Sequence, residues 1–279
     1  LVDGSRPRWS PDGRRIAYLA DTETTGTQLF VRWLDAAEAT QITRAGAAPS
    51  SHEWSPDGRF IAFVMRTPPE REWRIDLPPP PKGATWTEAP RVVDGVYFRQ
   101  DRRGFMEDGF HHLFVVDAEG GTPRQLTRGS WHVGARTYGI DAGATLSWTP
   151  DGRTVVCDGL AAEDGAERPF RRSHVYAVDV ASGQRRRLTQ GDGPWLGPRV
   201  SPDGRLVAFT GHPWTVQAYR AAELYVVGID GADMRSLTPE LDREPAQLHW
   251  RADGSALAFT AEDRGAAELF TVELRGRVR

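Results

Sequence analysis

The sequence predicts an all-β fold, a β-propeller built from four-stranded antiparallel blades. The main observation is a pentapeptide of the type Trp-Ser-Pro-Asp-Gly that occurs five times, each time followed by an apolar segment. The copies begin 45, 94, 52 and 50 residues apart, at Trp9, Trp54, Trp148, Val200 and Trp250. A repeat of about 40 to 50 residues made of short strands is typical of propeller blades.

The pentapeptide has the composition of a tight turn between the first and second strands of a blade. Pro presets φ at the first corner, Asp bonds nearby backbone donors, and Gly accepts a positive φ. The apolar segments that follow, such as 16–19 and 61–64, suit strands that are covered on both faces. We interpret the Trp that precedes four of the turns as a packing group between blades, not as a ligand cage.

Further strands complete each unit. Third strands are expected at 29–31, 113–116, 175–178, 224–227 and 269–272, and fourth strands end at the pairs 42–43, 126–127, 188–189 and 237–238. The interval of 94 is close to two periods, so a unit without the pentapeptide is expected between Trp54 and Trp148, with its first strand at 96–98. Six blades are therefore predicted in one domain over residues 1–279, at about 1–44, 45–95, 96–129, 130–191, 192–240 and 241–279.

The predicted ring is open at both ends. The sixth unit stops near Gly276 after its third strand, and Leu1-Val2 is too short to complete that unit. We therefore expect a chain that is cut at both ends of a seven- or eight-bladed parent.

Composition narrows the class of protein. The net charge of −3 does not favour nucleic acid, and no apolar run has the length of a membrane span. The single cysteine, Cys157, excludes an internal disulfide and fits a reducing compartment, so we expect a cytoplasmic protein. Lys82 is the only lysine and asparagine is absent; a GC-rich genome explains both counts, and selection for thermal robustness is the alternative.

The long connections are expected on one face of the propeller. In a four-stranded blade, the connections between second and third strands share a face with the crossings between blades. The long segments 66–90, 128–143, 158–172 and 211–220 all have such positions. Because binding is usually carried by long loops on a rigid scaffold, we predict contact residues there. The candidates are His132, Arg136, Tyr138, Trp214 and Tyr219; the alternative is that each only stabilises its own loop.

No catalytic motif is present. The chain has no Gly-x-Ser-x-Gly, no His-Glu-x-x-His, no cysteine pair and no phosphate-binding glycine loop. The neighbours His111 and His112 would point to opposite faces of a strand and could not chelate a metal together. We predict no catalytic residue, no metal ligand and no cofactor in this chain.

The repeated pentapeptide, the segment 78–86 with its four prolines, and the segments 96–105 and 112–117 resemble one family over essentially the whole chain. It is the propeller of prolyl oligopeptidase family serine peptidases, in the acylaminoacyl-peptidase-like branch. The resemblance implies a non-catalytic domain that gates and orients short peptides for a C-terminal α/β-hydrolase domain, which is absent from this chain. It implies that this domain and short peptides are the partners; association with a second copy of the chain is left open. The long-loop face is expected to meet the hydrolase domain.

Two other readings remain open. The first is a TolB-like propeller that binds a protein partner, since such propellers also use the pentapeptide. The second is an enzyme that binds metals in the propeller channel, as lactonases do. That chemistry needs convergent acids or asparagines on the inner strands, and this chain has no asparagine.

Overall fold

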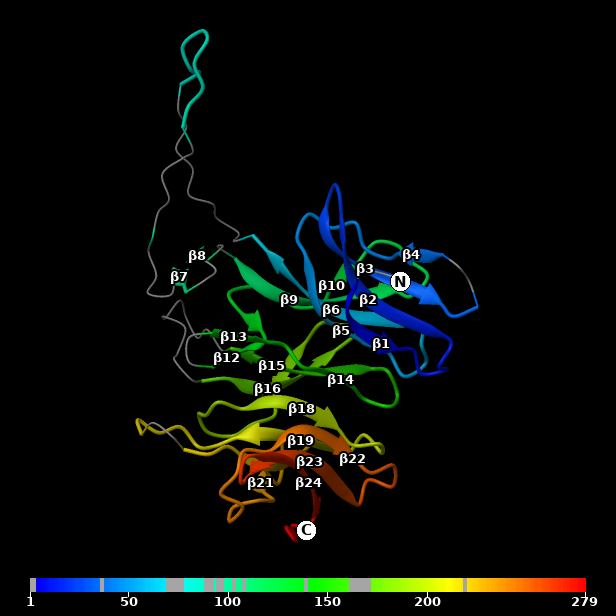
Figure 1. The fold of residues 1–279 in the computed structure, drawn as a ribbon, viewed down its shortest axis with the longest axis vertical. Coiled ribbons are helices and arrows are strands. Elements are labelled where there is room, and N and C mark those ends of the chain that lie inside the picture. The colour runs from blue at the N-terminus through cyan, green and yellow to red at the C-terminus, as the bar shows by residue number, and fades with distance from the viewer. Residues whose placement is uncertain are drawn as a thin grey trace.

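The computed structural model describes residues 4–35, 38–68, 78–87, 93, 98–101, 104–106, 109–137, 140–160, 172–217 and 220–279. Their regular structure consists of strands only, and the strands pair antiparallel into sheets that follow one another from the N-terminus to the C-terminus (Figure 1). The predicted all-β propeller class is confirmed.

Five sheets of the blade type are formed by the described residues. The first contains β1 (Ser5–Trp9), β2 (Arg15–Thr22), β3 (Gly26–Trp33) and β4 (Ala39–Gln41). The second contains β5 (Pro49–Trp54), β6 (Phe60–Thr67), β9 (Phe110–Asp117) and β10 (Arg124–Gln125). The third contains β11 (His132–Val133), β14 (Leu146–Trp148), β15 (Thr154–Leu160), β16 (His174–Asp179) and β17 (Arg185–Arg187).

The remaining sheets complete the described fold. The fourth contains β18 (Leu196–Val200), β19 (Leu206–Gly211), β20 (Glu223–Gly228) and β21 (Arg235–Ser236). The fifth contains β22 (Ala246–Trp250), β23 (Ala256–Asp263) and β24 (Ala266–Glu273). Two small hairpins lie outside these sheets, β7 (Arg99–Gln100) with β8 (Gly104–Phe105), and β12 (Ala135–Thr137) with β13 (Ile140–Gly143).

The second sheet corrects the predicted count of six blades. β6 pairs with β9 in continuous register, from Phe60 opposite Asp117 to Thr67 opposite Phe110. The segments 45–95 and 96–129, predicted as two blades, therefore share one sheet, and residues 68–109 connect its second and third strands. Prolines 78–81 cannot donate to a strand ladder, whereas 110–117 is long and apolar enough to pair with β6 along its whole length. Of the expected strand at 96–98, residues 96 and 97 lie outside the described residues, and Phe98 precedes β7.

Two further expectations are corrected. The segment 128–143 was expected to be a loop, but it contains β11, which pairs with the end of β15, as well as the β12–β13 hairpin. The last unit was expected to lack a fourth strand. Instead, the residues after Gly276 return to β24: Val278 bridges Val272, and Thr271 and Arg279 exchange hydrogen bonds of 2.9 and 2.8 Å.

The pentapeptide forms the predicted turn. The Ser10 hydroxyl donates to Asp12 Oδ1 (2.6 Å) and accepts the Arg15 N–H (2.9 Å), while Asp12 Oδ1 also accepts the Arg14 N–H (3.1 Å). The same bonds recur in the copies that begin at Trp54, Trp148 and Val200. The hydroxyl thus closes the turn and the carboxylate orders its tip, so this segment is a structural hairpin.

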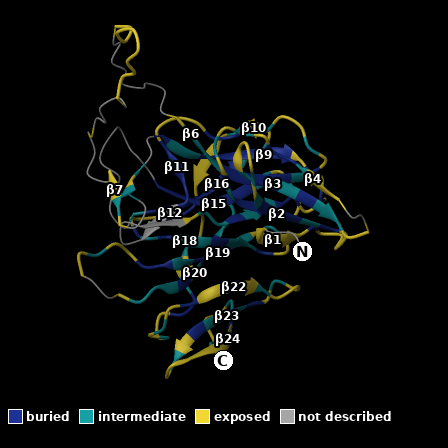
Figure 2. Ribbon diagram, turned by 45° about the horizontal axis from the view of Figure 1, so that its top comes forward, coloured by how far each residue is buried: buried dark blue, intermediate teal, exposed yellow. Residues whose placement is uncertain are grey.

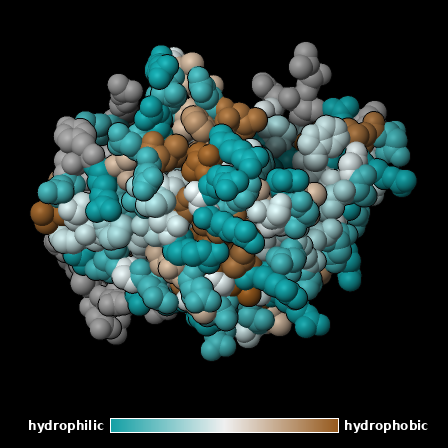
Figure 3. Space-filling view, turned by 90° about the horizontal axis from the view of Figure 1, so that it is seen from below, coloured by the Kyte–Doolittle hydropathy of each residue, from teal (hydrophilic) through white to brown (hydrophobic). Residues whose placement is uncertain are grey.

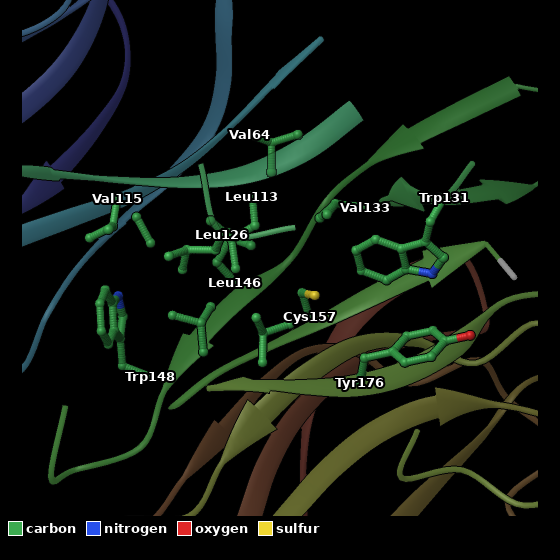
Figure 4. Close-up of a cluster of buried hydrophobic side chains, with 13 residues drawn as sticks. Val64, Leu113, Val115, Leu126, Trp131, Val133, Leu146, Trp148, Cys157 and Tyr176 are labelled. Carbon is green, nitrogen blue, oxygen red and sulfur yellow. The ribbon is translucent and has the colours of Figure 1, made fainter. Parts of the chain in front are cut away.

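The core lies between successive sheets. Alternate residues of one strand enter different clusters: Ile61 and Phe63 of β6 pack toward the first sheet, and Ala62 and Val64 toward the third. This explains why the strands are apolar at consecutive positions. Figure 4 shows the cluster between the second and third sheets, where Val64 and Leu113 face Cys157 and Tyr176.

The surface is mainly polar. Buried residues follow the strands within the stack of sheets, while exposed residues gather at the turns (Figure 2). The face in Figure 3 is largely hydrophilic, with apolar side chains gathered toward its middle. No helix in the described part of the chain has the length and hydrophobicity of a membrane span.

Candidate functional site

The five predicted contact residues fall in different environments. His132 is buried on β11, where its Nδ1 accepts the backbone N–H of His111 (3.2 Å) and its ring lies 4.9 Å from that of Phe110. Trp214 is exposed, and the Arg172 guanidinium lies 4.6 Å from the centre of its ring.

The other three candidates are not described in this way. Arg136 belongs to β12, and only its backbone is described. Tyr138 and Tyr219 lie outside the described residues. The binding role of all five residues stays a prediction.

A different set of polar residues lies on the first strands of the sheets. They share one position, directly before the first residue of each pentapeptide: Arg8, Glu53, Ser147, Arg199 and His249. Successive side chains of a strand point to opposite faces. Since Trp54 and Trp148 pack into the clusters between sheets, the preceding residue points away from those clusters.

Three of these residues meet at a cavity of about 80 Å³ between β1, β5, β14 and β18. Arg8, Glu53 and Arg199 line it, together with Arg6 and His52. The cavity is therefore built by four sheets, and its wall is strongly charged.

Of the charged groups in the cavity, Arg8 and Glu53 form an ion pair. Arg8 Nε lies 3.4 Å from Glu53 Oε2. Burial raises the pKa of Glu53, and the positive charges of Arg8 and Arg199 counter this shift. Arg199 is half-buried, and burial lowers its pKa, but the only hydrogen bond of its guanidinium goes to the Pro198 carbonyl (3.3 Å) among the described residues.

Asp158 orders the backbone next to the cavity. Its Oδ1 accepts the Thr145 N–H and its Oδ2 accepts the Gly197 N–H, both at 3.1 Å. These bonds connect the third and fourth sheets. Burial raises the pKa of Asp158 to about 6, while both backbone donors favour its ionised form.

His52 is the buried imidazole of the site. It lies in the wall of the cavity, where the backbone of Ala17 and Ser50 is within reach of its ring. Desolvation lowers the pKa of His52 to about 4, and the nearby backbone of Ala17 and Ser50 counters only part of the shift. The ring is neutral at neutral pH and offers one N–H donor and one acceptor.

Backbone irregularities aim these side chains. In β1, β5, β18 and β22 the pairing register shifts at corresponding places. Regular pairing resumes at the residue before the pentapeptide in β1, β18 and β22, and one residue earlier in β5. Arg6, Gly197 and Gln247 have positive φ values of 53°, 66° and 52° at equivalent positions. Bulges of this kind redirect side chains next to functional sites.

Sequence reasoning missed this site because it searched the long loops. A signal was present: the residue before the pentapeptide is polar in all five copies, although strongly apolar segments follow. No cluster of His, Cys, Asp and Glu suited to a metal ion occurs among the residues that the structure describes.

The middle part of the chain matches a known family. Residues 94–212 match the family described as the dipeptidyl peptidase IV N-terminal region. The chain is 25% identical over 164 residues to the uncharacterized peptidase YuxL of Bacillus subtilis. This alignment covers 58% of this chain and 23% of that protein. It is 23% identical over 136 residues to dipeptidyl-peptidase 5 of Porphyromonas gingivalis. This second alignment covers 48% of this chain and 20% of that protein. The matches thus span about a fifth of these relatives.

Solved structures show the same fold. The acylaminoacyl peptidase of Pyrococcus horikoshii aligns with a TM-score of 0.67 at 22% identity, over 100% of this chain and 38% of that one. The β-propeller domain of the Trilobed protease of Pyrococcus furiosus gives 0.61 at 16% identity, over 100% and 71%. A putative TolB of Agrobacterium tumefaciens gives 0.60 at 19% identity, over 99% and 79%. The solved structures show that the chain has the β-propeller fold, and its sequence is similar in part to peptidases and to the dipeptidyl peptidase IV N-terminal region.

Proposed function

We propose that this chain is the non-catalytic propeller of a serine peptidase of the acylaminoacyl peptidase or oligopeptidase type. In this proposal it gates and orients short peptides for an α/β-hydrolase domain of the same protein. The observation that carries the proposal is the alignment of the whole chain with 38% of a larger acylaminoacyl peptidase.

The arrangement of the sheets supports a gating role. The turns between first and second strands are the short pentapeptides, whereas the long connections 68–109, 161–173 and 212–222 all join second to third strands. The charged cavity between the first strands supplies groups that can bind the polar ends of a peptide. We propose that the long-loop face meets the hydrolase domain.

The test uses the protein encoded by the whole open reading frame. Its activity is measured on short acylated peptides, on a long unfolded polypeptide and on a folded protein. We expect hydrolysis of the short peptides only, and residues 1–279 alone should hydrolyse none of them. Activity of residues 1–279 alone would contradict a non-catalytic role, and equal rates on all three substrates would contradict gating.

A TolB-like interaction propeller is the alternative, and the alignment with a putative TolB over 79% of that chain favours it. It predicts an open reading frame without Gly-x-Ser-x-Gly and a stable complex with another protein. The cytoplasmic location and the association with a second copy stay predictions.

A further inference from the structure

We propose that the cavity between β1, β5, β14 and β18 is a carboxylate-binding subsite in which Arg199 is the principal ligand, assisted by Arg6. The inference rests on the proposed function in taking a short peptide as the source of the carboxylate. The site itself is argued from the groups that line the cavity.

The charge of the cavity favours an anion. Three guanidinium groups line it, from Arg6, Arg8 and Arg199, against one carboxylate, Glu53. Glu53 is paired with Arg8 at 3.4 Å. Neither Arg6 nor Arg199 forms an ion pair within the described part of the chain. The lining residues therefore carry a net charge of +2 (three arginines and one glutamate), which the buried Asp158 near Arg199 partly offsets.

Arg199 is held in the geometry of a binding group. It is half-buried, and four of its five guanidinium N–H groups have no acceptor among the described residues. Its backbone is fixed, because its carbonyl accepts the indole N–H of Trp250 (2.9 Å) and the adjoining bulge is tied to Asp158 through Gly197 (3.1 Å). A planar guanidinium with free parallel donors matches a carboxylate in a two-bond arrangement.

His52 closes one side of the cavity. The residue is 4% exposed, and the backbone of Ala17 and Ser50 lies within reach of its ring. On β5 it lies opposite Phe63, which packs toward the first sheet. The imidazole is therefore part of the wall, and the arginines supply the donors for a ligand.

The size of the cavity suits a small group at the end of a chain. Its volume of about 80 Å³ exceeds the roughly 10–15 Å³ that a single water requires, yet it is too small for a whole peptide. The subsite would therefore bind one terminus or one acidic side chain while the rest of the peptide lies outside.

The experiment measures binding to the intact protein by calorimetry, after treatment with a serine-reactive fluorophosphonate that prevents turnover. The probes are N-acetyl-Ala-Ala with a free carboxylate, its C-terminal amide, and N-acetyl-Ala-Glu-Ala-amide. We expect the free acid to bind at least about tenfold more tightly than the amide, the scale of one charge-assisted hydrogen bond. Binding of the third probe as tightly as the first would assign the carboxylate to acidic side chains as well as to the C-terminus.

Variants test the residues. Arg199→Gln should reduce the affinity for the free acid to that for the amide, and Arg6→Gln should weaken it severalfold. Arg6 is exposed, and its side chain forms no ion pair or hydrogen bond with another described residue, so the second variant tests the site even if the first folds poorly. The matched control is Arg205→Gln, on an exposed turn of the same sheet. Equal affinities for acid and amide, or unchanged binding in both cavity variants, would overturn the proposal.

This outcome is separable from the proposed function. A protein without hydrolase activity that still binds the free acid through Arg199 would refute the peptidase role and retain the subsite. A peptidase whose binding ignores Arg199 and Arg6 would do the reverse.

Discussion

The indole N–H of Trp54 donates a hydrogen bond to the backbone carbonyl of Arg8, 3.1 Å away in the preceding sheet. Trp148 bonds the carbonyl of Glu53 (3.3 Å) and Trp250 that of Arg199 (2.9 Å) in the same way. These acceptors are three of the four charged residues that line the cavity. The contact that joins neighbouring sheets therefore also fixes the backbone of the candidate site.

We expect Trp54→Phe to destabilise the fold by about 1–3 kcal/mol, because the Arg8 carbonyl loses its donor and the core loses volume. The matched control is Trp9→Phe, since Trp9 is 61% exposed. Its effect should stay within about 0.5 kcal/mol. The measurement is the free energy of unfolding in urea for both variants. Equal losses of stability in the two variants would contradict the role of Trp54 between sheets.

Gly204→Ala should cost about 1–2 kcal/mol, because Gly204 has a φ of 74° and an added Cβ would lie 3.0 Å from Pro150 Cδ. Gly46→Ala is the control: its φ is not positive and the space around it is open. That change should be neutral or slightly stabilising through the unfolded chain. Thermal unfolding of the two variants compares them, and a Gly204 variant as stable as the Gly46 variant would show that the turn tolerates a side chain.

Acidification should destabilise the fold through His112 and His174. Both are buried, and both contact the hydroxyl of a buried Thr, Thr127 at 3.1 Å and Thr189 at 3.0 Å. Desolvation lowers the pKa of each to about 4, below the ordinary value of 6.5. Between pH 6.5 and pH 4 the unfolded chain therefore binds more protons than the folded chain. The free energy of unfolding has its full value above about pH 6.5 and decreases as the pH falls toward 4.

The first sheet suggests the matched substitution. There Gln28 occupies the equivalent position and accepts the Thr43 hydroxyl at 2.8 Å. The variant H112Q/H174Q should therefore fold, and between pH 7 and pH 5 it should lose less stability than the wild type, by on the order of 3–4 kcal/mol for the two histidines together. Asp158, with its pKa raised to about 6, acts in the opposite direction but equally in both proteins. Parallel pH profiles of the two proteins would refute the assignment.

Glu53→Gln should increase the affinity of the cavity for the free-acid probe by roughly threefold, because it removes the negative charge that faces Arg8 and Arg199. The control is Glu119→Gln, an exposed carboxylate that pairs with Arg15 at 3.1 Å outside the cavity. It should leave binding unchanged. Weaker binding to the Glu53 variant would mean that Glu53 holds the ligand or its arginines in place.

Cys157 should be unreactive in the native protein. It is fully buried between the second and third sheets, and burial raises the pKa of its thiol well above the ordinary value. A disulfide reagent such as Ellman's should label it only after unfolding. Rapid labelling under native conditions would indicate that these sheets separate readily.

Local patterns explain the successful predictions. The turn at Ser10–Gly13 is specified by residues that bond within the same segment, and the two-faced packing of β6 follows from consecutive apolar residues. The extra blade was wrong for a nonlocal reason. β6 pairs with β9, although other segments between them were available as partners. The pairing depends on which segment fits β6 best in the folded state, and the spacing of motifs along the chain does not contain that information.

The sequence by itself determined the propeller class, the repeated turns and the residues that pack between sheets, because each depends on neighbours in the chain. Only the tertiary structure decided that β6 pairs with β9 and that Arg8, Glu53 and Arg199 meet at one cavity. Three different sheets bring these side chains together, and the bulges that aim two of them depend on strand pairing. The position of a charge relative to other charges is a property of the packed sheets, and it was this position that identified the candidate site.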